Sequence, residues 1–311
     1  MDNLWERSIP FCFITTKEAS EIFKQYDRRL ELLDIIPIDN GCRNSYYKIS
    51  TNKGLFILRI CPLNDISFKK EKILNEFFYG GSLKLPKLLY ISEYNSTKRV
   101  CMIYEYVYGN SLQEVVVQEG RVDDVIIQQV AEIAAHIHNC EVLDSAVFQN
   151  DYPPFISWFG LFLEKDIVRD RIGSDIKERV IKLIFEKQKQ LNDIDKYTSF
   201  IHSDFRPANM MIDTNKNIWI IDWEYSGYGH SLADIGQFFR YSDLYDEKNI
   251  KKFEVVYNRY ANKKLPSNWY ELSKLRDLIN PLQMLGDTEN CPQKYADLKN
   301  IILSTLAYLN Y

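Results

Sequence analysis

Apolar residues in the first third of the chain follow the short, β-prone pattern of strands. Turn-rich segments, such as Ser50-Thr51-Asn52-Lys53-Gly54, separate one apolar run from the next. The pattern predicts strands at 46–49, 55–60, 88–91 and 100–107. Two stretches with helical spacing interrupt them: Lys17 to Leu33, and Phe68 to Tyr79, which ends at Gly80-Gly81.

After Gly109 the pattern becomes helical. The spacing predicts an amphipathic helix whose buried stripe consists of Ile126, Val130, Ile133 and Ile137. Residues 161–191 and much of 253–309 are also expected to be helical. A single β interlude lies at 200–222. The sequence therefore predicts an α+β chain with two lobes. A small β lobe is expected at 1–104, a hinge at 105–109 and a larger helical lobe at 110–311.

Composition narrows the class of protein. The 311 residues are 46% apolar and 26% charged, with a net charge of −4, which argues against disorder and against a dedicated nucleic-acid binder. No apolar run approaches the roughly 20 residues of a membrane helix, and the N-terminus lacks a secretory pattern. We expect a cytoplasmic protein without nucleic-acid or membrane partners; its oligomeric state cannot be predicted.

The six cysteines lie far apart, without a C-x-x-C pair. Structural zinc sites need clustered ligands, so we expect reduced, buried thiols. Any metal should then be one that prefers oxygen ligands.

The segment 200–224 concentrates the polar residues that suggest chemistry. His202, Asp204, Arg206 and Asn209 occur within eight residues, and an apolar hairpin then leads to Asp222. A hairpin folds the chain back, so Asn209 and Asp222 are predicted to lie close together. Two oxygen ligands there would suit Mg²⁺.

This set matches the needs of phosphoryl transfer. Asp204 would act as the base for an acceptor hydroxyl, Asn209 and Asp222 would hold Mg²⁺, and Arg206 would offset developing charge. The alternative is a polar hairpin with solvated acids.

The spacing H-x-D-x-x-x-x-N followed by I-D-W-E resembles the aminoglycoside phosphotransferase and choline kinase-like superfamily, relatives of protein kinases. The segment Gly229 to Ile235 is similar to the family segment in which an Asp, here Asp234, supports the catalytic loop. The resemblance implies a bilobal protein-kinase-like fold and an Mg²⁺-dependent kinase that uses ATP or GTP. Antibiotic resistance would be the associated role.

The predicted strand at 55–60 is apolar on both faces and carries Arg59, which needs a partner if it is buried. Glu71 is the expected partner and Glu76 the second choice; Arg59 could instead extend to solvent from the strand end. By the resemblance, Arg59 replaces the kinase lysine that contacts the α- and β-phosphates, and Glu71 holds it.

Two further segments complete the predicted nucleotide site. Gly41 to Ser45, with Asn44 and Ser45, lies where the family has its phosphate-covering loop, although an ordinary β-turn fits the local sequence equally well. By the same resemblance, the backbone at Glu105 and Val107 forms the hinge that pairs with the purine. A plain edge strand is the alternative.

The acceptor is the least predictable part. We expect a small, hydroxylated and cationic molecule, since acids would suit an aminoglycoside and an aromatic cage would suit a quaternary ammonium such as choline. An ethanolamine-type metabolite, or a neutral hydroxylated acceptor such as a macrolide, a sugar or a homoserine-like metabolite, stays an alternative. The candidate residues are Asp151, Tyr152, Phe155, Trp158, Phe159, Glu164, Asp166, Trp223, Tyr225, Tyr228, Asp287 and Glu289.

Two histidines are expected to have structural roles: His202 would orient the catalytic loop, and His138 would be a packing residue. Glu224 could serve metal or acceptor binding, or be structural. Other classes to weigh are a non-catalytic kinase-like binding or spore-coat protein and a protein kinase. The absence of Asp-Phe-Gly and Ala-Pro-Glu segments disfavours the protein kinase.

Overall fold

The computed structural model describes residues 5–38, 41–94, 98–141, 147–148 and 153–311. The chain forms two compact units. The β unit comprises Asn3–Asn110 and Met211–Glu224, and the helical unit comprises Met1–Asp2, Ser111–Met210 and Tyr225–Tyr311. The N-terminal antiparallel sheet and the mainly helical remainder follow the predicted fold class. The hairpin after Met210 groups with the β unit, and the exact lobe boundaries predicted above stay a prediction.

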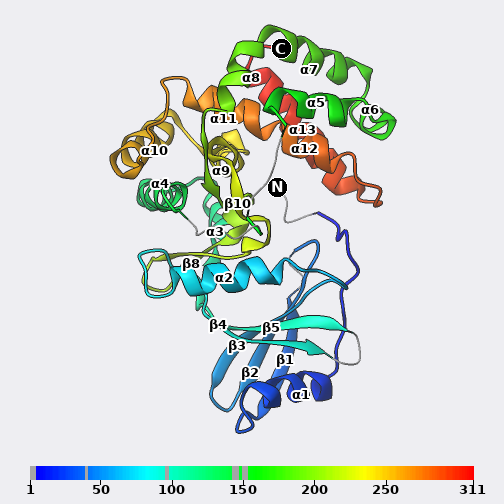
Figure 1. Ribbon diagram of the computed structural model, residues 1–311, viewed down its shortest axis with the longest axis vertical. Helices are drawn as coiled ribbons and strands as arrows, with labels where there is room; N and C mark the ends of the chain where they lie inside the picture. The colour runs from blue at the N-terminus through cyan, green and yellow to red at the C-terminus, as the bar shows by residue number, and fades with distance from the viewer. Residues whose placement is uncertain (1–4, 39–40, 95–97, 142–146, 149–152) are drawn as a thin grey trace. The chain divides into compact units, whose positions relative to one another are not determined.

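The β unit is built on a five-stranded antiparallel sheet in the order β1-β2-β3-β5-β4 (Figure 1). Its strands are β1 (Leu32–Ile38), β2 (Ser45–Thr51), β3 (Gly54–Ile60), β4 (Leu88–Tyr94) and β5 (Arg99–Glu105). The described residues of the unit also form the α-helices α1 (Thr16–Tyr26) and α2 (Phe68–Phe78).

Strand β3 is central, as its apolar sequence predicts, and its two faces meet different partners. Leu58 and Ile60 join the hydrophobic cluster that includes Ile22 and Phe23 of α1. Because side chains alternate across a strand, Arg59 faces the other side, where α2 supplies its ion-pair partner.

The helix predicted from Lys17 to Leu33 is wrong in its second half. Helix α1 ends at Tyr26, and strand β1 begins at Leu32. Asp27 explains the ending, because its carboxylate accepts hydrogen bonds from the backbone N–H of Arg29 and from Lys53. Such a local turn competes with helix continuation.

The predicted hairpin is confirmed as β8 (Met210–Asp213) and β9 (Ile218–Ile220), with β6 (Gly109–Ser111) as the third strand of a small sheet. Asp213 closes the turn, because its Oδ1 accepts the N–H groups of Asn215 and Asn217. Gly109 is required by close packing, since a Cβ there would lie within 2 Å of the carbonyl oxygen of Ile212.

The helical unit surrounds a short two-stranded sheet in which β7 (Thr198–Ile201) pairs antiparallel with β10 (Gly227–His230). Strand β10 lies beyond the β interlude expected from the sequence. The α-helices of this unit are α3 (Leu112–Glu119), α4 (Asp124–His138), α5 (Phe155–Leu163), α6 (Asp166–Ile172), α7 (Ser174–Glu186), α8 (Gln188–Ile194), α9 (Ser231–Phe238), α10 (Glu247–Tyr260), α11 (Trp269–Asp277), α12 (Ile279–Met284) and α13 (Pro292–Tyr308).

Helix α9 is the centre of this unit, and every one of its residues is buried. It packs against α11, and Gly236 permits the approach because a Cβ there would lie 2.4 Å from the carbonyl oxygen of Ser273. Helix α4 packs against α10; of the predicted stripe, Val130 and Ile137 are buried, whereas Ile126 and Ile133 are half-buried. A rigid α9 matters for the site, because it holds the loop that follows β7.

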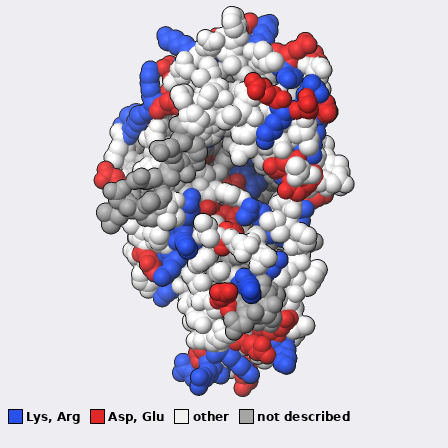
Figure 2. Space-filling view, turned by 45° about the vertical axis from the view of Figure 1, so that its right-hand side comes forward, with Lys and Arg blue, Asp and Glu red and all other residues white. Residues whose placement is uncertain are grey.

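Two properties concern possible partners: the distribution of charge on the surface, and the length and apolarity of the helices. Figure 2 shows acidic and basic side chains interspersed over the face in view, without a single broad basic patch on it. Among the described residues, no helix combines the length and apolarity needed to cross a bilayer.

Candidate active site

The predicted catalytic loop leaves β7 at Ile201 and enters the short helix η2 (Pro207–Asn209). Ser203 within it has φ +68°, a left-handed conformation that a non-glycine residue adopts at some cost. Such a conformation persists only where the surroundings fix it. The loop must therefore be held by strong contacts.

Asp234 and Gln237 of α9 supply those contacts. The Asp234 carboxylate accepts the backbone N–H groups of His202 and Ser203, both at 2.8 Å. Gln237 accepts the N–H of Phe205 and donates to the carbonyl of Ser203, again at 2.8 Å. The supporting role that the resemblance implies for Asp234 matches this geometry, whereas Gln237 was missed by the sequence analysis.

His138 does more than pack. Its Nε2 lies 3.2 Å from Asp234 Oδ2, and its Nδ1 lies 2.8 Å from the hydroxyl of Tyr257. The expectation that His138 is a packing residue with satisfied hydrogen bonds is confirmed. Its contact with Asp234 also links it to the loop, because Asp234 accepts hydrogen bonds from the loop backbone. Nothing in the local sequence of α4 or α10 indicated this link, because 119 residues separate His138 from Tyr257.

Asp204 carries a two-pronged salt bridge with Arg206. Arg206 Nε donates to Oδ1 at 2.5 Å and Nη2 donates to Oδ2 at 2.8 Å. Burial acts to raise the pKa of Asp204, but the charge and hydrogen bonds of Arg206 outweigh it and lower the pKa below its usual value. The carboxylate is therefore ionised at neutral pH, as a proton acceptor must be.

Asn209 is tied to the same carboxylate. Its Nδ2 donates to Asp204 Oδ2 at 2.7 Å and to the Asp204 carbonyl at 2.9 Å. This orientation uses the amide nitrogen internally, which leaves Oδ1 as the side-chain atom suited to bind a cation.

In the β unit, Arg59 is surrounded by carboxylate side chains. Its side chain is 1% exposed and forms ion pairs with Glu71 and, at 2.5 Å, with Glu224. The predicted Arg59–Glu71 pair is confirmed, while Glu76 lies on the surface near Lys72. Burial acts to lower the pKa of Arg59, but the surrounding acids raise it well above its usual value, so the guanidinium stays charged.

Glu224 is the residue whose role the sequence left open. It is 5% exposed and accepts hydrogen bonds from Arg59 and, at 3.0 Å, from Nδ2 of Asn44. Its carboxylate is therefore committed to ion pairing inside the β unit. Tyr104 adds a contact that was missed, because its hydroxyl donates to Glu71 at 2.5 Å.

Asp222 completes an acidic group with Glu71 and Glu224, whose oxygen atoms lie within 4.8 Å of one another. Its Oδ1 is 3.7 Å from Arg59 Nη1, and its side chain is the most exposed of the three, at 23%. Since Glu71 and Glu224 make the shorter contacts with Arg59 and one guanidinium cannot neutralise three acids, Asp222 is the carboxylate best placed to take a cation. Oxygen donors of this kind fit Mg²⁺.

The two predicted metal ligands belong to different units, with Asn209 in the helical unit and Asp222 in the β unit. Their convergence on one ion stays a prediction.

The predicted phosphate loop precedes β2. Asn44 and Ser45 are both buried, at 3% and 2% exposure, and Ser45 Oγ accepts the backbone N–H of Cys12 at 2.8 Å. The Ser45 hydroxyl thus serves local structure. A phosphate contact from Ser45 would therefore come from its backbone.

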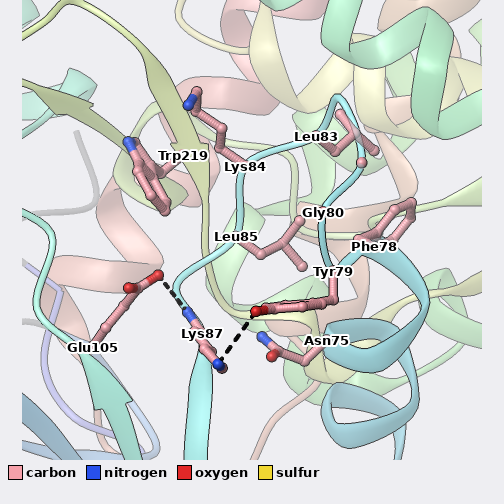
Figure 3. A pocket seen from close by; sticks show the side chains of 11 residues that line it. Asn75, Phe78, Tyr79, Gly80, Leu83, Lys84, Leu85, Lys87, Glu105 and Trp219 are labelled. Carbon is pink, nitrogen blue, oxygen red and sulfur yellow. Dashed lines mark hydrogen bonds between the residues drawn. The ribbon is translucent and has the colours of Figure 1, made fainter.

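At the predicted hinge, the Glu105 side chain turns toward Lys87 (Figure 3). Its Oε1 accepts the Lys87 N–H at 2.7 Å, and its own N–H donates to the Lys87 carbonyl at 3.0 Å. The contact of Glu105 with a purine would therefore have to use its carbonyl, with the backbone of Val107 as the donor. The cavity of about 300 Å³ beside Glu105 is lined also by Tyr79, Lys84 and Trp219.

Several of the candidate acceptor residues serve as core. Phe155, Phe159 and Trp223 are at most 3% exposed. The guanidinium of Arg276 lies over the rings of Phe155 and Trp158, at 5.1 and 5.2 Å. A cationic side chain of the protein itself therefore covers these two rings. Asp151 and Tyr152 lie outside the described residues.

Among the acids, Asp287 pairs with Lys294 at 3.2 Å. Oε2 of Glu289 is buried and accepts no hydrogen bond from the described residues.

Comparison with known proteins identifies the family. Residues 34–263 match the model of the phosphotransferase enzyme family, APH. This chain belongs to that family.

Individual relatives are distant. Ethanolamine kinase 2 of Mus musculus is 25% identical over 175 residues, which cover 54% of this chain and 41% of the relative. The chain thus matches less than half of that relative's length.

Solved structures share the fold. A thermostable mutant of aminoglycoside phosphotransferase APH(4)-Ia, in ternary complex with AMP-PNP and hygromycin B, has a TM-score of 0.67 at 18% identity, covering 94% of this chain and 98% of that one. Choline kinase LicA from Streptococcus pneumoniae has a TM-score of 0.64 at 17% identity, covering 93% and 99%. The kinase-like fold predicted from the sequence is confirmed.

Proposed function

We propose that this protein transfers the γ-phosphoryl group of ATP or GTP to a hydroxyl group of a small molecule. The observation that carries the proposal is the arrangement of Asp204, which is paired with Arg206 and lies in a loop that Asp234 holds through the backbone of His202 and Ser203. Positioning and electrostatics account for most of phosphoryl-transfer catalysis, so a rigid carboxylate beside a cation is the feature to look for.

Asp204 accepts the proton of the acceptor hydroxyl as that oxygen bonds to the γ-phosphorus. The bond from phosphorus to the β–γ bridging oxygen breaks, and the nucleoside diphosphate leaves. Arg206, whose side chain is 19% exposed, offsets the negative charge of the transferring group. Asn209 keeps the Asp204 carboxylate in its orientation through Nδ2.

Arg59, held by Glu71, is assigned to the α- and β-phosphates of the donor, and the loop with Asn44 and Ser45 covers them. The carbonyl of Glu105 and the N–H of Val107 pair with the purine. Asn209 through Oδ1 and Asp222 would hold Mg²⁺, which supplies neutralisation of the phosphate oxygens when bound.

For the acceptor, we propose a polycationic, hydroxylated molecule of the aminoglycoside type. Two observations favour it over choline. Arg276 already covers the rings of Phe155 and Trp158, and the Glu289 carboxylate has a buried oxygen without a hydrogen bond from the described residues. A buried carboxylate oxygen in that state gains from a cationic partner.

An amino alcohol such as ethanolamine is the second candidate. It is supported by the 25% identity to an ethanolamine kinase over more than half of this chain.

The test is a screen of nucleotide consumption with ATP and with GTP. Aminoglycosides, macrolides, choline and ethanolamine are the acceptors, and Asp204→Ala is the control for background hydrolysis. We expect acceptor-dependent consumption by the wild type alone. Equal consumption by both proteins, or none with any acceptor, would contradict the proposal and favour a non-catalytic binding protein.

A further inference from the structure

An N-terminal strap, defined here as residues 7–12, runs beside the loop Gly41 to Ser45 within the β unit and hydrogen-bonds to its carbonyl oxygens. Arg7 Nη1 donates to the Gly41 carbonyl at 2.5 Å. Arg7 Nη2 donates to the Asn44 carbonyl at 2.7 Å and to that of Arg43 at 3.3 Å.

The remaining carbonyl of the loop, that of Cys42, accepts hydrogen bonds from the backbone of the strap. The N–H groups of Ser8 and Ile9 both donate to the Cys42 carbonyl, at 3.0 and 3.1 Å. All four consecutive carbonyls of the loop, from residue 41 to residue 44, therefore accept hydrogen bonds from one short segment.

The strap itself is anchored further along. Arg7 Nε donates to the Ile9 carbonyl at 3.2 Å, and the guanidinium lies 5.1 Å above the ring of Phe11. The hydroxyl of Tyr47 donates to the Cys12 carbonyl at 2.7 Å. Arg7 is thus pre-oriented before it meets the loop.

The geometry of the peptide bond gives this arrangement a consequence. In a trans peptide, the C=O of one residue and the N–H of the next point in opposite directions, and the described residues contain no cis peptide. Carbonyls fixed toward the strap direct the N–H groups of Cys42, Arg43 and Asn44 away from it. Successive N–H groups on one side form a concave site that suits an anion.

We infer that Arg7 is a positioning residue that shapes this loop to bind the phosphates of the donor nucleotide. The loop has one glycine, Gly41, at φ +106°, where phosphate loops commonly use several. The guanidinium of Arg7, bridging three carbonyls, imposes the conformation that glycines would otherwise permit. The inference rests on the proposed function, because it assumes that a nucleotide binds here.

The test separates phosphate binding from purine binding in the full-length protein. Dissociation constants for Mg·ATP and for adenosine are measured by calorimetry, or for Mg·GTP and guanosine if GTP is the donor. We expect Arg7→Ala to weaken Mg·ATP binding about tenfold and to change adenosine binding less than about twofold. Arg7→Lys should lie between the two proteins, because one ammonium group cannot bridge three carbonyls.

Arg29→Ala is the matched control, since Arg29 is 81% exposed in the same unit and pairs with Asp27 away from the loop. It should leave both constants unchanged. Hydrogen exchange of the 41–45 amides should rise in Arg7→Ala and not in Arg29→Ala. Should Arg7→Ala fail to fold, the same comparison is made with Arg7→Lys.

Unchanged Mg·ATP binding in Arg7→Ala, or equal loss of Mg·ATP and adenosine binding, would overturn the positioning role while leaving the proposed function intact. Failure of the wild type to bind either nucleotide would instead refute the proposed function, and this inference with it.

Discussion

Arg206 donates two parallel hydrogen bonds to Asp204, from Nε to Oδ1 at 2.5 Å and from Nη2 to Oδ2 at 2.8 Å. Two residues separated by one position thereby form a bidentate pair, which is stronger than a single hydrogen bond. The pair sets the protonation state of the proposed base.

Replacing Arg206 by Gln should move the acid limb of the activity profile. Without the guanidinium, the influence of burial on the pKa of Asp204 is no longer outweighed, so that pKa rises. The pH at which kcat/KM falls on acidification should therefore increase. Arg169→Gln, at a more exposed position in α6, is the control and should leave the profile in place. An unshifted limb in Arg206→Gln would show that Asp204 is not the titrating base.

Asp204→Ala should abolish transfer while nucleotide binding remains nearly intact. Loss of a general base costs at least about 100-fold in kcat, whereas other residues are proposed to hold the nucleotide. Steady-state kinetics and calorimetry on the same preparation measure the two effects. Asp170→Ala, on the surface of α6, is the matched control. Full turnover in Asp204→Ala would remove the base assignment.

Asp222→Ala should weaken Mg·nucleotide binding by about tenfold or more, because a cation would lose a carboxylate ligand. Binding of the nucleotide in the presence of EDTA should change little. Calorimetry with and without Mg²⁺ makes the comparison, and Asp34→Ala, an exposed acid of β1, serves as control. Equal loss in both conditions would point to a structural role for Asp222.

Glu224→Gln should lower the free energy of unfolding by about 3 kcal/mol, since it removes one partner of a buried charge. Arg59 would keep Glu71, and Asn44 would keep an amide partner. Glu76→Gln, whose side chain is 70% exposed, should change stability by less than about 0.5 kcal/mol. Urea unfolding of the three proteins tests the difference, and equal midpoints would contradict the buried pair.

His230 should make the protein less stable in mild acid. Burial and the neighbouring Arg276 lower the pKa of His230 to about 4, although Asp195 acts to raise it. Between about pH 6.5 and pH 4 the unfolded chain binds a proton that the folded chain excludes, so stability falls as pH falls. From pH 7 to pH 5 the loss attributable to His230 should be about 2 kcal/mol. Urea unfolding at both values, with His230→Gln as the comparison, measures it; parallel losses in both proteins would exclude His230 as the cause.

The sequence by itself determined those features that depend on local pattern. Four polar residues at fixed spacing before an apolar hairpin predicted a catalytic loop, and an arginine within an apolar strand required an acid such as Glu71. The alternation of strands in one part and helices in the other predicted the fold class. The first two signals are local in the chain, and the third is the sum of many local patterns.

Only the tertiary structure decided the contacts between distant segments. Arg7 reaches a loop 34 residues away, Glu224 reaches Arg59 across 165 residues, and Tyr257 reaches His138 across 119. The predicted helix ran past Tyr26 into the first two residues of β1, because the turn at Asp27 that follows α1 depends partly on Lys53, a residue of a distant segment. Such contacts depend on which buried polar groups must find partners, and that depends on packing rather than on spacing.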